Sequence, residues 1–337
     1  MIKVGLVGCG RISKKHSNIL GDNLVDGITL KAVCDINFNK AQNIAKKYNV
    51  IPYSSMHEMM IKEEIDLIAV LTESGNHAKN VIELSKYGKD IIVEKPMALN
   101  NKDAELMIEA CNNNKIKLFV IKQNRYNNAI AELKETIQKK KLGKLFLGTV
   151  RVRWSRDQKY YDQDGWRGTL AMDGGVLSNQ ASHHIDLLHW LMGPVESVFA
   201  KSKTAQVKIE AEDTALVILK FKSGALGLIE ATTATRPNDL EGSISILGSM
   251  GTIVVGGFAA NKVDTWNILG EVNSSMDYLN ENPKDVYGFG HIKLYQKIVN
   301  DFKNDESTLV DGIEGLKSVK IISAIYESVK TNKEVRL

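Results

Sequence analysis

The first 122 residues alternate short apolar runs with longer amphipathic segments, and this alternation limits the possible folds more than any other feature. Strands that are apolar throughout are buried on both faces, as in a parallel sheet covered by helices. The pattern predicts strands at residues 2–7, 29–34, 66–71, 90–93 and 117–121, with helices at 12–20, 40–48, 78–87 and 103–112. We therefore expect residues 1–122 to form an α/β domain with a doubly wound parallel sheet.

The pattern changes after residue 122, where strands joined by short glycine-containing turns become frequent. Such turns are typical of antiparallel sheets. The predicted elements are helices at residues 129–140, 175–192, 289–302 and 312–331, and strands at 145–153, 197–203, 214–221, 225–233, 242–247 and 252–255. Residues 123–337 are therefore expected to form a second α/β domain with a mostly antiparallel sheet, for substrate binding and oligomerisation. A chain of 337 residues is long enough for two such domains.

The first predicted strand runs into a turn with glycine at positions 8 and 10 and a small residue, Ser13, at the third position of a dinucleotide-binding fingerprint. Gly8 permits the tight turn, and Gly10 lets a pyrophosphate approach the backbone. The helix that follows offers unpaired N–H groups to the phosphates. We expect Arg11 and Ile12 in this turn to contact the cofactor as well. The fingerprint predicts a Rossmann domain.

An acidic residue, Asp35, follows the second predicted strand at the spacing expected for a ribose anchor. Its carboxylate can accept hydrogen bonds from both ribose hydroxyls and repels a 2′-phosphate. The next residues, Ile36 and Asn37, include no arginine that could bind such a phosphate. The predicted cofactor is therefore NAD and not NADP.

A second motif, Glu94-Lys95-Pro96, stands at the carboxyl end of a predicted buried strand, where open α/β sheets place their ligands. Pro96 forces Lys95 into an extended or turn conformation, and the bond between them can be cis. A lysine partly shielded from water can accept a proton, so Lys95 is a candidate general base.

A third motif lies in residues 173–186, where Asn179, His183 and Asp186 are spaced to share one face of the predicted helix. A histidine oriented by a helix neighbour suits proton transfer, which makes His183 a second catalytic candidate. His184 and His189 are five residues apart and point in different directions, so we interpret both as structural and expect no metal.

Composition excludes several classes of partner. The 44 Lys and Arg and 40 Asp and Glu are scattered along the chain, which does not favour nucleic-acid binding. No apolar run approaches the roughly 20 residues that a membrane span requires. The three cysteines form neither a disulfide framework nor a metal-type spacing. A cytoplasmic protein without membrane contacts is expected.

Together these motifs resemble the Gfo/Idh/MocA oxidoreductases, which combine a Rossmann domain, a Glu-Lys-Pro segment and a later glycine-led helix with a histidine. The resemblance spans the whole chain and implies NAD-dependent oxidation of a CH–OH group, with Lys95 and His183 as catalytic residues. One departure is Asn179, which stands where the family usually has Asp. Its amide can orient substrate but cannot take a proton. Implied cofactor contacts are Gly8, Gly10, Arg11, Ile12, Asp35, Thr72, Ser74, His77, Glu94, Lys95 and Gln123.

A narrower similarity, carried by residues 122–127, 151–168 and 179–183, is to enzymes that oxidise C3 of UDP-N-acetylglucosaminuronic acid (UDP-GlcNAcA) for bacterial surface polysaccharides. A substrate with two phosphates and a carboxylate needs fixed cations, and this region gathers arginines and aromatic residues. The same loop could instead be a subunit contact. The implied substrate contacts are Lys95, Arg153, Arg156, Tyr160, Trp166, Arg167, Asn179 and His183.

Two alternatives stay open: a dehydrogenase for another sugar, nucleotide sugar or inositol, and a ligand-sensing regulator without catalysis. Retention of Lys95 and His183 argues against the regulator. The second sheet also needs a partner on its outer face, whether that face is Val217, Leu219 and Phe221 or Leu226, Leu228 and Glu230. A homodimer or homotetramer through this sheet is therefore expected.

Overall fold

The computed structural model describes residues 1–271, 275–283, 285–304 and 308–337. The chain divides into two compact units. The first unit contains Met1–Ile121 and His291–Val319, and the second contains Lys122–Gly290 and Lys320–Leu337.

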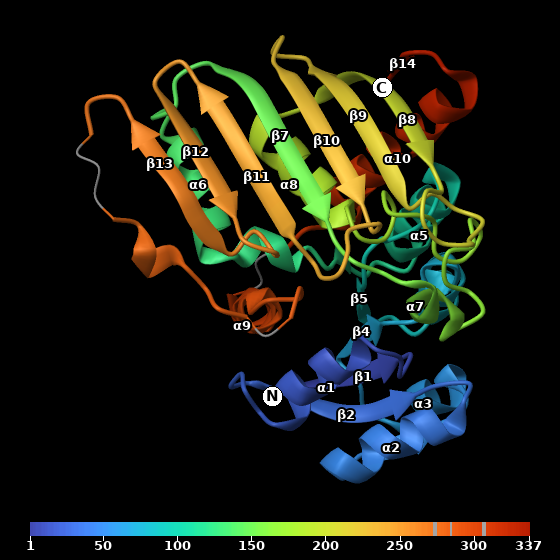
Figure 1. Ribbon diagram of the computed structural model, residues 1–337. Helices are drawn as coiled ribbons and strands as arrows, with labels where there is room; N and C mark the ends of the chain where they lie inside the picture. The colour runs from blue at the N-terminus through green and yellow to red at the C-terminus, as the bar shows by residue number, and fades with distance from the viewer. Residues whose placement is uncertain (272–274, 284, 305–307) are drawn as a thin grey trace. The chain divides into compact units, whose positions relative to one another are not determined.

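Within the described residues of the first unit, six strands form one parallel sheet with the order β3-β2-β1-β4-β5-β6. Figure 1 labels β1, β2, β4 and β5 of this sheet. The chain adds strands on one side of β1 and then, from β4 onward, on the other side. This is the doubly wound Rossmann sheet that the sequence predicted. Open sheets of this kind bind ligands beyond the carboxyl ends of their strands, at the point where the strand order reverses, which here lies between β1 and β4. The strands are β1 (Ile2–Val7), β2 (Ile28–Cys34), β3 (Ile51–Tyr53), β4 (Leu67–Val70), β5 (Asp90–Val93) and β6 (Leu118–Val120).

Helices bury the strands of this sheet, since all four residues of β4 and the last three of β5 are inaccessible to solvent. The helices of the first unit are α1 (Ser13–Gly21), α2 (Phe38–Tyr48), α3 (Met56–Lys62), α4 (His77–Ser85), α5 (Asn101–Asn113), α9 (Gly290–Asn304) and the start of α10 (Gly312–Thr331). None of the described helices of the chain is long and apolar enough to cross a membrane.

Two features of this unit differ from the sequence expectation. The short pair β3 and α3 was not predicted, because three strand residues and seven helical residues carry too weak a periodicity. The segment His291–Val319 belongs to the first unit, although the prediction placed it in the second domain. Contacts such as that of Val299 with Gly27, where a Cβ would lie 3.0 Å away, hold α9 in the first unit.

In the described part of the second unit, eight strands form a sheet with the order β13-β12-β11-β7-β10-β9-β8-β14. All neighbouring strands run antiparallel except β7 and β10, which are parallel. The mostly antiparallel sheet is therefore confirmed. The strands are β7 (Leu145–Arg153), β8 (Val195–Lys203), β9 (Thr214–Phe221), β10 (Leu226–Thr232), β11 (Glu241–Gly248), β12 (Gly251–Gly256), β13 (Lys262–Ile268) and β14 (Val335–Arg336).

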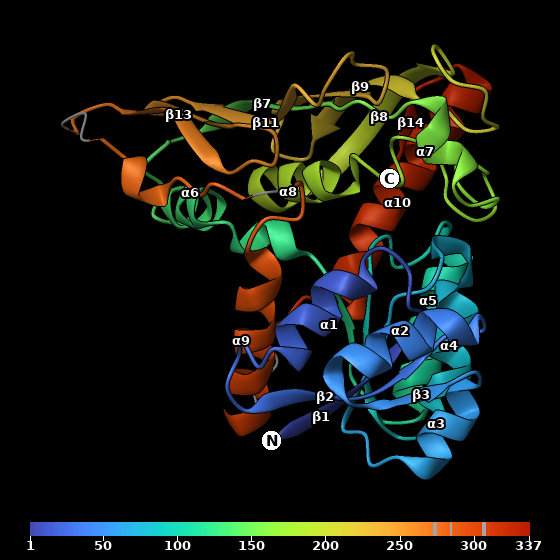
Figure 2. The same cartoon turned by 60° about the horizontal axis from the view of Figure 1, so that its bottom comes forward.

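Helices cover one face of this sheet. Figure 2 shows α6 (Asn128–Gln138) and α8 (Ser182–Met192) along that face, and the second half of α10 adds Ile321, Ile322 and Ile325 to the same apolar core. The other face carries no helix among the described residues, and we call it the open face.

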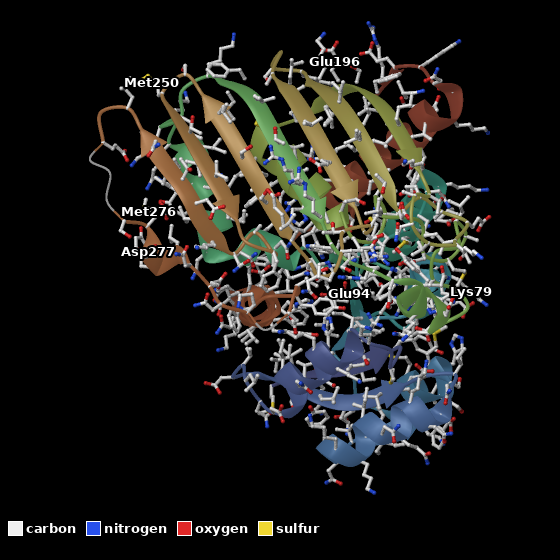
Figure 3. The ribbon with its side chains drawn as sticks, viewed as in Figure 1. Lys79, Glu94, Glu196, Met250, Met276 and Asp277 are labelled. Atoms are coloured by element: carbon white, nitrogen blue, oxygen red, sulfur yellow. The ribbon has the colours of Figure 1, made fainter. Side chains whose placement is uncertain are left out.

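The strands β9 and β10 show which side chains belong to each face. Val217, Leu219 and Phe221 are buried in the core, so this predicted set faces the helices. Leu216, Ile218, Leu226 and Leu228 alternate with core residues, are 36–56% exposed and lie on the open face. Figure 3 shows the side chains of the sheet, including Glu196 on β8 and Met250 in the turn between β11 and β12.

Candidate active site

The turn between β1 and α1 has the geometry of a phosphate-binding loop. Gly8 has a φ of +101°, and a Cβ there would lie 2.7 Å from the backbone of Leu71 and Thr72, so only glycine fits. A Cβ on Gly10 would meet no other described atom within 4 Å. The chain's own packing therefore does not require glycine at position 10, whereas a ligand that approaches the backbone would. Ser13 is fully buried and donates from its Oγ to the Gly10 carbonyl at 2.6 Å.

The start of α1 fits the pyrophosphate of a dinucleotide. Its N-cap residue, Ile12, provides no side-chain hydrogen bond to the first turn, and Arg11 beside it is exposed. Amides at a helix start that no side chain caps are available to an anion. The fingerprint and the helix thus meet where the sequence predicted, and the residues present fit a dinucleotide.

Asp35 follows β2 directly and is oriented by the backbone. The amide of Cys9 donates to Oδ2 at 2.7 Å, and the amide of Asn37 donates to Oδ1 at 2.8 Å. Each carboxylate oxygen keeps a second lone pair that can accept a ribose hydroxyl. The half-buried carboxylate therefore lies beside the glycine turn with its orientation fixed.

The loop after β4 contains three predicted cofactor residues, Thr72, Ser74 and His77. Both ring nitrogens of His77 lie against backbone carbonyls: Nδ1 is 2.8 Å from the Pro96 oxygen and Nε2 is 3.0 Å from the Thr72 oxygen. Burial lowers the pKa of His77, so the ring is neutral and donates to one of the two carbonyls. These two contacts indicate that His77 holds the loop after β4 to the Glu94-Lys95-Pro96 segment. A direct contact of His77 with the cofactor stays a prediction.

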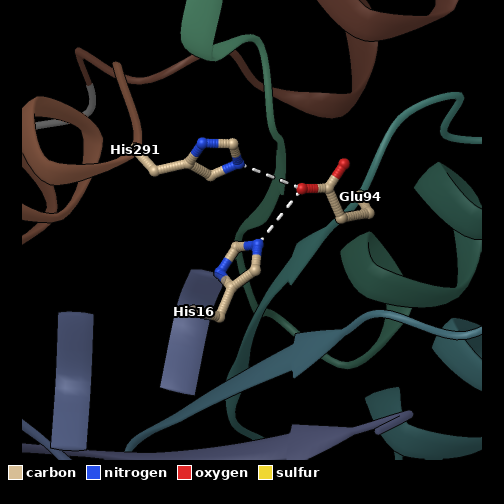
Figure 4. Close-up of side chains that lie close together, drawn as sticks. All are labelled: His16, Glu94 and His291. Carbon is tan, nitrogen blue, oxygen red and sulfur yellow. Dashed lines mark hydrogen bonds and ion pairs between the residues drawn. The ribbon is translucent and has the colours of Figure 1, made fainter. Parts of the chain in front are cut away.

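The Glu94-Lys95-Pro96 segment leaves β5 with a cis bond before Pro96. Glu94 is 4% exposed, and its Oε2 accepts the amide of Lys95 at 2.9 Å. Its Oε1 accepts two imidazole N–H groups, from His16 at 3.1 Å and from His291 at 3.3 Å (Figure 4). Burial alone would raise the pKa of Glu94, but the bonds from the two histidines outweigh it and hold the pKa well below the usual range. Glu94 is therefore a buried carboxylate.

Sequence reasoning missed both histidines. His16 lies on α1 and His291 on α9, and nothing in the periodicity of either helix connects them with residue 94. The available signal was that each places a polar ring among apolar neighbours on its helix. Such a ring needs a buried partner.

In the second unit, His183 lies in the first turn of α8 and is 7% exposed. Its Nε2 is 2.9 Å from Nε2 of Gln123, which lies in the short helix η2 (Gln123–Tyr126). The prediction gave Gln123 to the cofactor, and in this unit its side-chain amide holds the ring of His183.

Asp186, one turn further along α8, forms a buried charge cluster. Arg125 donates to it through two bonds of 2.7 and 2.8 Å, and Nζ of Lys122 is 3.4 Å from Oδ1. Burial raises the pKa of Asp186, but the two cations hold it well below its usual range. These contacts fix α8 to the segment that carries Gln123, and so help orient His183.

Asn179 does not lie on the helix, which begins at Ser182 and not at residue 175 as predicted. Residues 176–180 form turns instead, and the backbone amides of Val176 and Leu177 bond to Glu212. A Cβ at position 175 would lie 2.1 Å from the carboxyl of Glu212, so glycine is required where the chain passes that group. Asn179 donates from its side chain to Asp173. A carboxylate is thus present beside Asn179, on a different residue from the one usual in the family.

Two of the predicted substrate arginines lie in one cluster with aromatic rings. The guanidinium of Arg167 lies 4.5 Å from the ring centre of Trp166 and 4.9 Å from that of Tyr160. Arg156 lies 5.4 Å from the Tyr160 ring and 5.5 Å from the Trp154 ring. Each arginine also has a carboxylate partner, Asp164 for Arg167 and Asp239 for Arg156. The structure therefore brings Arg156, Tyr160, Trp166 and Arg167 together.

Arg153 lies elsewhere. It alternates on β7 with the buried Val152 and therefore projects from the open face. Its guanidinium bonds Glu230 through Nε and Nη2 at 2.6 and 2.7 Å, and Glu241 through Nη1 at 3.1 Å. This pairing favours a place in the sheet surface over the substrate contact predicted for it.

Within the described residues, one group has side-chain ligand atoms close enough to hold a metal ion. It consists of His16, Glu94 and His291, whose atoms lie within 4.8 Å of one another. Both imidazole Nε2 atoms already lie at hydrogen-bond distance from one carboxylate oxygen, 3.1 Å for His16 and 3.3 Å for His291, and the three side chains are 0–5% exposed. The geometry therefore favours a hydrogen-bonded cluster.

Comparison with known proteins identifies both halves of the chain. The profile of the GFO_IDH_MocA oxidoreductase family, NAD-binding Rossmann fold, matches residues 2–122. The profile of the C-terminal alpha/beta domain of the same family matches residues 134–337. A curated relative, the myo-inositol 2-dehydrogenase of Thermotoga maritima, is 27% identical over 100% of this chain and 98% of its own length.

Two solved structures are more similar in sequence. The WlbA dehydrogenase from Bordetella pertussis, in complex with NADH and UDP-GlcNAcA, is 39% identical, with a TM-score of 0.92 over 100% of this chain and 97% of that chain. The WlbA dehydrogenase from Chromobacterium violaceum, in complex with the same two molecules, is 41% identical, with a TM-score of 0.92 over 100% of this chain and 96% of that chain.

Proposed function

Because this chain belongs to the Gfo/Idh/MocA oxidoreductase family, with an NAD-binding Rossmann domain, we propose a specific reaction for it. It is an NAD-dependent dehydrogenase that acts on a sugar or polyol. The proposed substrate is UDP-GlcNAcA, oxidised at C3 to the 3-keto sugar in bacterial surface polysaccharide synthesis. The observation that carries this proposal is the whole-chain similarity, at 39–41% identity, to two dehydrogenases that bind NADH and UDP-GlcNAcA.

The arginine and aromatic cluster of the second unit supports a nucleotide-sugar substrate. Arg156 and Arg167 are cations held against the rings of Tyr160 and Trp166. A guanidinium can bind phosphate or carboxylate oxygens in pairs, and the rings offer stacking surface to a base or a sugar. An uncharged polyol would make little use of fixed cations.

The proposed chemistry assigns a separate task to each residue. NAD, when bound, would supply the hydride acceptor for the sugar carbon. Lys95 takes the proton of the hydroxyl group, while His183, held by Gln123, orients that hydroxyl. Asn179 donates to Asp173 and positions the substrate without taking a proton. In the first unit, Gly10 and the start of α1 bind the pyrophosphate, and Asp35 binds the adenosine ribose.

A second candidate substrate is a free polyol such as myo-inositol, because the Thermotoga maritima relative is a myo-inositol 2-dehydrogenase. At 27% identity that relative is more distant from this chain than the two UDP-GlcNAcA-bound dehydrogenases. Asn179 also departs from the acid that the family usually has at this position, which argues against the inositol branch.

The experiment is a substrate comparison with purified protein and NAD. UDP-GlcNAcA, UDP-N-acetylglucosamine and myo-inositol are supplied in turn, and NADH formation is followed together with the mass of the sugar. The proposal expects turnover of UDP-GlcNAcA with loss of two hydrogens. UDP-N-acetylglucosamine is the matched control, since it differs only in carrying a CH₂OH group in place of the carboxylate.

We also propose that the chain assembles as a homodimer or homotetramer through the open face. Leu216, Ile218, Leu226 and Leu228 present an apolar surface there that a monomer would leave in water. The nearby Arg153, paired with Glu230 and Glu241, adds charges of both signs, so the face can meet a second copy of itself. The three free cysteines suit the cytoplasm that the proposed substrate also requires.

A further inference from the structure

We propose that His16 and His291 are positioning residues for Lys95, acting through the buried carboxylate of Glu94. This inference rests on the role proposed above for Lys95. It assigns a function to three side chains that come from α1, from the end of β5 and from α9.

The hydrogen bonds of the cluster are fixed in direction. A carboxylate only accepts, so Nε2–H of each histidine must donate to Glu94 Oε1. In the tautomer that carries its single proton on Nε2, His16 Nδ1 accepts from the hydroxyl of Tyr295, which lies 2.7 Å away. Burial raises the pKa of Tyr295, so its hydroxyl keeps the proton that it donates. Neither ring needs a charge to make these bonds.

The two oxygens of Glu94 have different tasks. Oε1 is anchored by the two rings, and Oε2 accepts the backbone amide of Lys95 at 2.9 Å. The same carboxylate thus connects two helices to the residue that starts the loop. His77 holds the other side of the loop at the Pro96 oxygen. Lys95 lies between these two buried anchors.

The surroundings explain why both histidines are needed. Glu94, His16 and His291 are at most 4% exposed, so water cannot replace a lost donor. A buried carboxylate that loses a hydrogen bond becomes easier to protonate and less firmly held. The charged and titratable groups that act on the cluster are Lys15, His77 and Tyr295. None of them donates to Glu94 in the bonds described here, so none substitutes for a missing imidazole.

The position of His291 gives α9 a role in the first unit. The helix begins at Gly290, and His291 is its second residue. Tyr295, one turn further along, bonds His16. Two side chains of α9 therefore connect it to the Glu94 cluster, which explains why a segment so late in the sequence belongs to the nucleotide-binding unit.

The test uses a matched pair of substitutions at one position. His291→Gln keeps an N–H donor near the position of Nε2, whereas His291→Leu removes it at similar volume. With UDP-GlcNAcA and NAD, we expect His291→Leu to lower kcat by about tenfold and to change KM for NAD by less than about twofold, since the defect lies at Lys95. His291→Gln should restore kcat to within about threefold of the unaltered protein.

A second readout needs no substrate. Trace acetic anhydride labels free amines, and mass spectrometry then compares Lys95 with Lys79, which is exposed on α4 (Figure 3). Glu94→Gln and His291→Leu should raise the ratio of Lys95 to Lys79 labelling by about threefold or more, because a segment that has lost its anchor opens more often and exposes the half-buried Lys95 to the reagent. His291→Gln should leave the ratio nearly unchanged.

The outcomes separate the two proposals. If kcat and the labelling of Lys95 are both unchanged in His291→Leu, the positioning role is refuted whatever the substrate is. If Lys95→Met has normal kcat, the proposed base is wrong, and the labelling ratio still tests the cluster. Stoichiometric zinc that is lost in His291→Leu, with activity abolished by a chelator, would show a metal centre in place of the hydrogen-bonded cluster.

Discussion

His184, next to His183 on α8, offers the most quantitative test of the packing described here. It is completely buried, and its ring meets the ring of Trp154 edge-on at 6.0 Å. Burial lowers the pKa of His184 to about 4, from an ordinary value of 6.5. Between these two values the unfolded chain binds a proton that the folded chain does not. Stability is therefore complete above about pH 6.5 and falls as the pH is lowered toward 4.

The expected size follows from the two pKa values. At about 1.4 kcal/mol for each pH unit, the histidine removes about 3 kcal/mol of unfolding free energy between neutral pH and pH 4. His184→Phe keeps a ring against Trp154 but cannot be protonated. Between neutral pH and pH 4, its free energy of unfolding should therefore fall by about 3 kcal/mol less than that of the unaltered protein.

The assay is urea unfolding at a series of pH values, followed by tryptophan fluorescence. All four tryptophans of the chain lie in the second unit, so the signal reports on the unit that contains His184. His57→Gln is the control, because the side chain of His57 is 49% exposed and belongs to the first unit. An unchanged pH slope in His184→Phe would refute the buried, neutral state assigned to His184.

Three further predictions concern the cofactor, the catalytic pair and the assembly. Asp35→Ser should narrow the preference for NAD over NADP, measured as the ratio of their dissociation constants, and tighter binding of NADP by the unaltered protein would contradict the role of Asp35. Lys95→Met should lower kcat by a factor of about 10² to 10⁴ with NAD affinity nearly unchanged, and His183→Asn should lower it by less; near-normal kcat in both would place the active site elsewhere. Ile218→Asp together with Leu226→Asp should give a monomer by light scattering, and a monomer in the unaltered protein at micromolar concentration would rule out assembly through the open face.

Much of the fold, and the places of the candidate cofactor residues within it, were predictable from the sequence because the signals are local. The Rossmann sheet follows from short apolar runs, and the glycine turn lies within a few residues of β1. Asp35 follows β2 and Lys95 follows β5, so each was found from its own strand end. Elements of this kind need no knowledge of distant contacts.

The sequence could not show which residues far apart in the chain contact each other in the folded protein. Glu94 is held by His16 and His291, which come from opposite ends of the chain, and neither histidine belongs to a motif. The start of α8 was placed too early because residues 175–181 have helical spacing, whereas in the structure residues 176–180 form turns and the amides of Val176 and Leu177 bond to Glu212. A contact with a residue so distant in the sequence is not visible in local spacing.

Arg153 is a predicted substrate residue whose place on the open face the strand pattern itself could have shown. It stands two residues after Arg151 and next to the apolar Val152, and this alternation puts both arginines on the face opposite the core. Arginine and aromatic residues are abundant over the whole of positions 151–167, and this concealed the point at which the strand ends and the loop begins. The strand ends at Arg153, and the cluster of Arg156, Tyr160 and Arg167 begins after it.

Incubation of the purified protein with UDP-GlcNAcA and NAD, followed by mass spectrometry of the sugar nucleotide, tests the central claim most directly. We predict a product lighter by two hydrogens, formed in step with NADH. When C3 of the sugar carries deuterium, the product should lose that deuterium and the reduced cofactor should contain it. Reduction of NAD by myo-inositol, with no change in UDP-GlcNAcA under the same conditions, would contradict the proposed function.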